Sequence, residues 1–325
     1  MWAETERDVL QMELKVHYKS RRRGVPAEAL PVPDFSGCAH QLLAMEHPFI
    51  RSYQAGAAVV YLADKQINWV GQKAYLTLLL AISDKRRPDN VLTNPLAAQR
   101  RQIAKVDGEG SDHSCHVVIS LNPSMKGGRY YRAAFEQVPL FSPQYVHRFV
   151  RHVFTEVTMK HPITVPHPAG VRAKGGEFEQ IPVALKTEFG AVPSEELLRD
   201  LENGEFGGIE LSREEPGLQK FDDGAFTVDK RSVLYLSPAD RHQKPRIMDV
   251  VKSVCAKANT KDYSTAKVIW KVNGRTHTAK FDCDSGSVAE NRYIKRHTIA
   301  LENALPASCD KIDAHLARSM MSWIS

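Results

Sequence analysis

The sequence contains no apolar run long enough to cross a bilayer, and it begins with acidic residues instead of a basic stretch leading into an apolar segment. We therefore expect a soluble cytoplasmic protein with no signal peptide and no membrane insertion. The five cysteines are scattered and never form C-x-x-C, which argues against a disulfide framework or a four-cysteine zinc site, so we expect reduced thiols. A length of 325 residues, of which 42% are apolar, suits two domains with separate cores.

The fingerprints of the common nucleotide-binding and hydrolase classes are missing. There is no G-x-x-x-x-G-K-[ST] loop for a triphosphate, no G-x-G-x-x-G after a strand, no H-E-x-x-H and no G-x-S-x-G elbow. We therefore assign no catalytic residue and expect no cofactor and no bound metal. The sequence favours a binding protein over an enzyme.

Two groups of metal-ligating or titratable side chains give weak signals. Residues 112–116 hold Asp, His and Cys, but a strand that begins at Cys115 directs Cys115 and His116 to opposite faces, which is poor chelating geometry. His147 and His152 flank arginines on one helix, yet their spacing places the two imidazoles about 140° apart around the helix axis. We interpret the first group as a polar loop entering a strand and the second as a basic helix face.

A metal-dependent nuclease is an alternative function. It would need clustered carboxylates that hold Mg²⁺, together with a lysine close by. Two segments offer such groups, although neither has the usual order of an acidic pair followed by a lysine. The groups are Glu177, Glu179, Lys186 and Glu188 in one segment, and Asp282 and Asp284 in the other.

Alternating segments of period-two and helical patterning indicate an α/β (α+β) fold of two domains, with mostly antiparallel sheets flanked by helices. We place an N-terminal α/β domain at residues 1–159, a Pro/Gly-rich linker at 160–176 and a C-terminal α+β domain at 177–325. In the first domain, Ser142-Pro143 is typical of a helix start, and the polar segment 95–104 is helical in composition.

The C-terminal domain holds the clearest local pattern of the chain. Residues 264–272 and 275–282 alternate on either side of Asn273-Gly274, the dipeptide that a type I′ turn requires. An amphipathic helix at 246–258 precedes this hairpin, and a helix at about 309–324 follows it. We therefore expect a C-terminal helix–hairpin–helix unit.

The formal net charge of +6 is distributed unevenly along the chain. Residues 1–170 sum to +6, residues 171–240 to −7 and residues 241–325 to +7. Cationic segments suit a polyanionic partner such as nucleic acid. The acidic segment at 191–230 could instead dock a basic protein partner or itself mimic DNA. The simpler alternative is that the charge only keeps the protein soluble. Further cationic loops lie at 21–23, 85–87 and 100–105.

The hairpin concentrates positive charge. Its two-residue turn pairs Val272 with Arg275 and Lys267 with Lys280, so one face is apolar and the other carries lysines. A DNA phosphate would relieve the like-charge pair of lysines; alternatively, the lysines protect a sheet edge from aggregation. No helix groups Asn, Gln and Arg for base edges, so we expect phosphate contacts without sequence preference. The candidate DNA-binding residues are Lys267, Lys271, Arg275, His277, Lys280, Arg241, Lys244, Arg246, Lys252, Arg292, Lys295, Arg296, Arg86, Arg87, Arg129 and Arg132.

The order of elements resembles that of the RexA-like phage-exclusion proteins. The resemblance begins with a short strand that ends in Tyr18-Lys19-Ser20-Arg21 and continues from Ile181 to Ser212 with a strand, a short helix, an acidic turn and a strand. It is clearest from Pro245 to Ile324, where a basic helix, a hairpin and a terminal helix follow one another. The resemblance implies a two-domain homodimer that binds DNA without sequence preference in phage exclusion, abortive infection or another antiviral defence. A partner defence subunit is a further possibility.

Overall fold

The computed structural model describes residues 5–124, 127–173, 175–220, 228–237, 246–259, 261, 263, 265–283, 288 and 293–325. Contacts within the chain divide it into two units. Unit 1 comprises Met1–Phe189 and His297–Ser325, and unit 2 comprises Gly190–Arg296. Helices and mostly antiparallel strands occur in both units, so the expected mixed α+β class is confirmed.

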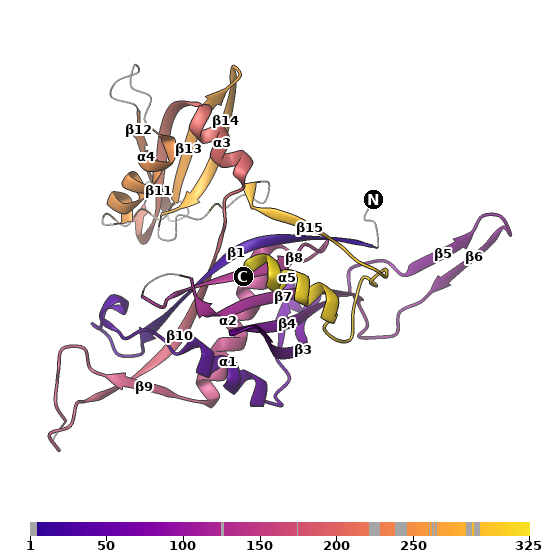
Figure 1. Cartoon of the computed structure of the whole chain (residues 1–325), viewed down its shortest axis with the longest axis horizontal. Helices are drawn as coiled ribbons and strands as arrows, with labels where there is room; N and C mark the ends of the chain where they lie inside the picture. The colour runs from indigo at the N-terminus through magenta and orange to yellow at the C-terminus, as the bar shows by residue number, and fades with distance from the viewer. Residues whose placement is uncertain are drawn as a thin grey trace. The chain divides into compact units, whose positions relative to one another are not determined.

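A curled nine-stranded sheet forms the body of unit 1 (Figure 1). The strand order is β2-β3-β4-β7-β8-β1-β10-β9, and β15 also pairs with β1. Strand β4 is buried along almost its whole length because side chains cover both of its faces, which explains its continuous apolar run. The strands are β1 (Glu6–Ser20), β2 (Ile50–Tyr53), β3 (Ala58–Val70), β4 (Lys73–Asp84), β7 (Ser111–Pro123), β8 (Tyr130–Glu136), β9 (Ile163–Pro166), β10 (Gln180–Ala191) and β15 (Arg296–Ala300), with short 3-10 turns η1 (Ala27–Ala29) and η2 (Gln54–Gly56).

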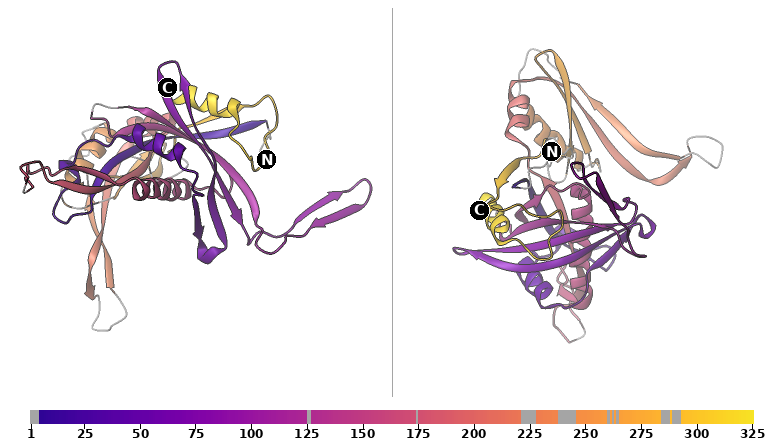
Figure 2. Two further views of the ribbon diagram at one scale, coloured as in Figure 1. Left: turned by 90° about the horizontal axis from the view of Figure 1, so that it is seen from below. Right: turned by 90° about the vertical axis from the view of Figure 1, so that its right-hand side faces the viewer.

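Helices lie on both faces of this sheet (Figure 2). Helices α1 (Phe35–Ala44) and α2 (Pro143–Lys160) cover one face, and α5 (Ala314–Ile324) covers part of the other. Helix α2 begins as Ser142-Pro143 predicts, because the Ser142 hydroxyl accepts a hydrogen bond from the Tyr145 N–H at 3.4 Å. Unit 1 therefore has an apolar core on each side of one sheet.

A two-stranded arm projects from unit 1 (Figure 1). It consists of β5 (Asn90–Asn94) and β6 (Gln99–Ile103), which form five antiparallel residue pairs. The prediction that residues 95–104 are helical is wrong. The chain reverses directly after Asn94, whose side-chain oxygen accepts a hydrogen bond from the Ala97 N–H at 3.2 Å, and the following residues pair with β5.

Unit 2 contains two α-β-β modules that pair side by side. Its sheet has the order β12-β11-β13-β14, so the first strands of the two modules are the central ones. The two helices and one face of the sheet share a single buried core, whose largest fully buried side chain is Trp270. The elements are α3 (Glu195–Asn203), β11 (Glu205–Lys220), β12 (Val228–Leu236), α4 (Ile247–Asn259), β13 (Thr265–Val272) and β14 (Arg275–Asp282).

This division differs from the predicted one. Residues 160–176 contain β9, which pairs with β10 and therefore belongs to the sheet of unit 1. The hairpin β13–β14 has the predicted register, with Val272 opposite Arg275. The helix–hairpin–helix unit is not confirmed, because α5 packs on the sheet of unit 1 while α4 and the hairpin belong to unit 2.

Candidate nucleic-acid interface

The sheet of unit 2 has one covered face and one open face. Ala266, Val268 and Trp270 of β13 are fully buried against the core that the two helices complete. Because successive side chains of a strand point to opposite faces, Lys267 and Lys271 lie on the open face. This open sheet face is made of Lys267, Ile269, Lys271, Lys280 and Tyr235.

The strand register places four side chains in one row across the open sheet face. Tyr235 lies opposite Glu210, Glu210 opposite Lys267, and Lys267 opposite Lys280. The Nζ atom of Lys267 lies 3.2 Å from the Oε2 atom of Glu210. The carboxylate of Glu210 therefore offsets the repulsion between Lys267 and Lys280, and no bound anion is needed to do so.

Three hairpin cations keep their charge exposed. Lys271, Arg275 and Lys280 are exposed and form no ion pair with any described residue. Lys271 and Lys280 lie on the open sheet face, and Arg275 lies at the turn. Tyr235 presents a side chain that is 70% exposed at the other side of the same face. The face thus combines point charges with one exposed ring, a combination that suits phosphates and an unstacked base.

The other candidates of unit 2 lie elsewhere or are engaged. His277 stacks on Trp270 with ring centroids 5.8 Å apart, and Lys295 pairs with Glu195 at 3.4 Å. Arg246 and Lys252 are exposed at α4, on the helical side of the sheet. Arg296 is exposed at the start of β15, whereas Arg241, Lys244 and Arg292 lie outside the described residues.

Of the four candidates in unit 1, three are held by internal contacts. Arg86 forms two hydrogen bonds with the carboxylate of Asp84, at 2.9 and 2.7 Å, and these bonds lower the pKa of Asp84 to about 2. The exposed Arg87 has no ion-pair partner among the described residues. The remaining two donate to carbonyl groups: Arg129 to Leu30 at 2.8 Å, and Arg132 to Ile324 and Ser325 at 3.4 and 2.5 Å.

The arm of unit 1 adds two cations that the candidate set omits. Arg100 and Arg101 lie on β6, are exposed and have no ion-pair partner among the described residues. They belong to a cationic loop of the sequence, and the turn signal Asn94-Pro95 just before them is the local sign of a hairpin. The net charge of each unit also shows that most of the excess positive charge belongs to unit 1. Unit 2 has 18 Lys and Arg against 17 Asp and Glu, a net +1, whereas unit 1 has 26 against 21, a net +5.

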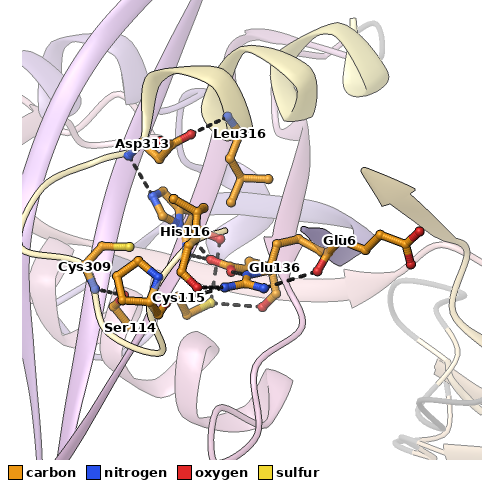
Figure 3. Close-up of polar contacts among 11 residues, drawn as sticks. Glu6, Ser114, Cys115, His116, Glu136, Cys309, Asp313 and Leu316 are labelled. Carbon is orange, nitrogen blue, oxygen red and sulfur yellow. Dashed lines mark hydrogen bonds and ion pairs between the residues drawn. The ribbon is translucent and has the colours of Figure 1, made fainter. Parts of the chain in front are cut away.

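The predicted polar loop at residues 112–116 is part of β7 and contributes to a buried polar network (Figure 3). Glu136 accepts hydrogen bonds from Nδ1–H of His116 at 2.7 Å and lies 3.0 Å from Nε of Arg7. The Nε2 atom of His116 accepts from the N–H of Asp313 at 3.0 Å, which makes the imidazole neutral. Because both ring nitrogens are used, this network fastens the segment before α5 to the sheet.

A cavity of about 580 Å³ lies beside this network. Its lining includes Arg7 and Glu136, which neutralise each other, and two side chains with an unpartnered buried polar atom, His113 and Gln137. Burial lowers the pKa of His113, which favours its neutral form. The lining offers no excess positive charge, so it does not suit a phosphate.

The groups considered for a nuclease are dispersed. Glu179 pairs with Arg22 at 2.6 Å, and Glu188 lies 4.0 Å from His17. Asp284 and the side chain of Asp282 lie outside the described residues. Within the part of the chain that is described, no three His, Cys, Asp or Glu side chains gather as metal ligands.

The two histidines of α2 do not face each other. Nε2–H of His147 donates to the carbonyl of Thr187 at 3.0 Å, whereas Nδ1 of His152 lies 3.9 Å from Glu156. The five cysteines are free thiols. No helix in the described ranges is long and apolar enough to span a membrane. Comparisons with protein-family models, curated proteins and solved structures found no match to this chain.

Proposed function

We propose that this protein binds DNA through its phosphate backbone and without sequence preference. The observation that carries the proposal is the group of three exposed hairpin cations, Lys271, Arg275 and Lys280, which form no ion pair with any described residue, although Glu205 lies opposite Lys271 in the strand register. Lysine and arginine side chains bind phosphates through their charge, and contacts to phosphates carry no sequence information. The exposed ring of Tyr235, on the open sheet face that carries Lys271 and Lys280, adds a surface for stacking.

The structure sharpens the choice of residues. The Lys267 ammonium already has a carboxylate partner in Glu210, so its contribution to phosphate binding is smaller than that of Lys271 or Lys280. Arg86, Arg129 and Arg132 bind internal carboxylate and carbonyl groups and are assigned to stability. The resemblance to RexA-like proteins supports a wider proposal, in which a cytoplasmic homodimer uses this binding in phage exclusion.

The test replaces the three hairpin cations together, as Lys271→Gln/Arg275→Gln/Lys280→Gln. A matched control, Arg246→Gln/Lys252→Gln/Lys261→Gln, removes the same charge from exposed positions on or next to α4, which packs on the other side of the sheet. Affinity for duplex DNA is measured by fluorescence anisotropy over a salt series. We expect the hairpin variant to flatten the slope of log K against log [salt] by roughly 0.9 for each lost phosphate contact, and the control to change the slope little.

Two results would contradict the proposal for this surface. One is an unchanged salt slope in the hairpin variant. The other is an equal loss in the control, which would show that the hairpin is not the preferred DNA-binding surface. Circular dichroism of both variants verifies that the substitutions at these exposed positions leave the fold intact.

A further inference from the structure

The β5–β6 arm is a narrow ribbon with no apolar core of its own. Every residue from Asn90 to Ile103 is exposed. Isolated two-stranded hairpins are only marginally stable in water, so a ribbon of this kind gains from a partner that covers it. Its five residues per strand extend over roughly 17 Å, which is the length of about five base-pair steps of DNA.

The tip of the arm is apolar and protrudes. Leu96 is 99% exposed, directly follows Pro95, and is followed by two alanines. An apolar side chain in this position is not stabilised by burial within the described chain, and its exposure to water is unfavourable. Leucine and proline are among the residues that DNA-bending proteins insert as wedges between base steps.

Behind the tip, the arm carries positive charge on both faces. Arg100 and Arg101 are strand neighbours, so their guanidinium groups leave the ribbon on opposite sides. Arg87 adds charge at the base, where the Nζ atom of Lys105 donates to the carbonyl of Arg87. The N–H of Lys105 and the amide of Gln102 hydrogen-bond the arm's carboxylate, Asp89. Phosphates line both edges of a DNA groove, so cations on both sides of a ribbon match this arrangement.

We propose that the arm enters the minor groove of duplex DNA, where Arg100 and Arg101 contact phosphates of opposite strands and Leu96 wedges between two base pairs and bends the duplex. This inference rests on the proposed function and adds the form of the substrate and a deformation of it. The strands of a ribbon lie about 4.8 Å apart and the minor groove is about 6 Å wide, so entry requires the widening that a wedge produces.

The test measures bending and affinity separately. The full-length chain is mixed with a duplex of about 30 base pairs that carries a donor dye and an acceptor dye at its ends, and energy transfer reports the bend. We expect the wild-type chain to raise energy transfer. Leu96→Ser should abolish the rise while it changes affinity by less than about threefold, because the phosphate contacts remain.

Two further variants complete the design. Arg100→Gln/Arg101→Gln should lower affinity about tenfold at 0.1 M salt and flatten the salt slope by roughly 1.8. Trp69→Ser serves as the matched control, since Trp69 of β3 is 65% exposed beside the β3–β4 turn, which precedes β4 at the end opposite to the arm. It should bind and bend like the wild type. All these side chains are exposed, so their substitution leaves the fold intact.

Each contrary outcome has a distinct meaning. No binding by the wild type at 0.05 M salt overturns the proposed function and this inference together. Binding without bending, or bending that survives Leu96→Ser, overturns the wedge and leaves the proposed function standing. Filling the minor groove of an A·T-rich duplex with netropsin should prevent the bend, and a bend that persists overturns the assignment of the groove.

Discussion

The two β-hairpins of this protein have the same backbone form for different reasons. The hairpin β13–β14 buries one face, including Trp270, in the core of unit 2 and turns through Asn273-Gly274. The arm β5–β6 buries nothing and turns through a segment whose Ala98 has a positive φ of 50°. The first hairpin is a structural element that also presents charge. The β5–β6 arm gains little stability from packing, so we infer that it contacts a partner outside the chain.

The largest expected difference between the hairpins concerns stability. Trp270→Ala should lower the free energy of unfolding of unit 2 by about 3–5 kcal/mol, because it leaves a large cavity in a core that cannot fully collapse. Leu96→Ala should change stability by less than about 0.5 kcal/mol, because Leu96 makes no buried contact. Hydrogen exchange of core amides in each unit measures both effects. A cost below about 1 kcal/mol for Trp270→Ala would contradict the assigned core.

The two turns should respond in opposite directions to glycine and alanine. Gly274 has a φ of 74° and free space where a Cβ would lie, so Gly274→Ala should cost about 1 kcal/mol through backbone strain alone. Ala98→Gly should relieve a similar strain in the arm and increase the protection of its amides from hydrogen exchange. If Ala98→Gly lowers the protection of the arm's amides, the left-handed conformation of Ala98 is not what limits the stability of the arm.

The pairing of Lys267 with Glu210 predicts a smaller effect. Glu210→Gln removes the carboxylate that pairs with Lys267, which in turn lies opposite Lys280. The substitution should therefore destabilise unit 2 by about 0.2–1 kcal/mol. It should also strengthen DNA binding, since Lys267 then becomes available to phosphate. Urea denaturation and anisotropy measure the two quantities. A weaker DNA affinity in Glu210→Gln would contradict the location of the binding face.

A separate expected effect is the acid response at the base of the arm. Hydrogen bonds from Arg86 lower the pKa of Asp84 to about 2, from an ordinary value near 4. The ionised carboxylate therefore stabilises the folded state fully above about pH 4, and this stabilisation is lost as the pH falls through about 2. Carbon NMR of Asp84 should give a midpoint near 2, and Asp84→Asn should remove this step. A titration midpoint of Asp84 near 4 would contradict the hydrogen bonds between Arg86 and the Asp84 carboxylate.

The sequence predicted those parts of the fold that depend on local chemistry. The start of α2 at Ser142-Pro143, the type I′ dipeptide and the register of β13 with β14 follow from capping, turn preference and alternation. The arm was missed because its residues have the composition of a polar helix, while strand pairing across the turn decided its structure. Composition was also misleading at residues 160–176, where prolines and glycines belong to β9 and its loop.

The site was harder to predict than the fold because charge in a sequence does not reveal its partner. Glu210 stands 57 positions from Lys267, and only the strand register brings them together. Arg132 meets the C-terminal residues only because α5 lies on the sheet of unit 1. The exposed cations could be identified only once these long-range contacts were known.

The most direct test of the account is the affinity of the unmodified full-length chain for nucleic acid as a function of salt. Anisotropy with two unrelated DNA duplexes, single-stranded DNA and duplex RNA covers 0.05–0.2 M salt. If Lys271, Arg275 and Lys280 each contact a phosphate, the slope on duplex DNA should be roughly −2.7 for both sequences, a loss of affinity of about 40-fold over this range. Absence of binding at 0.05 M salt, or an affinity that does not change with salt, would contradict the account.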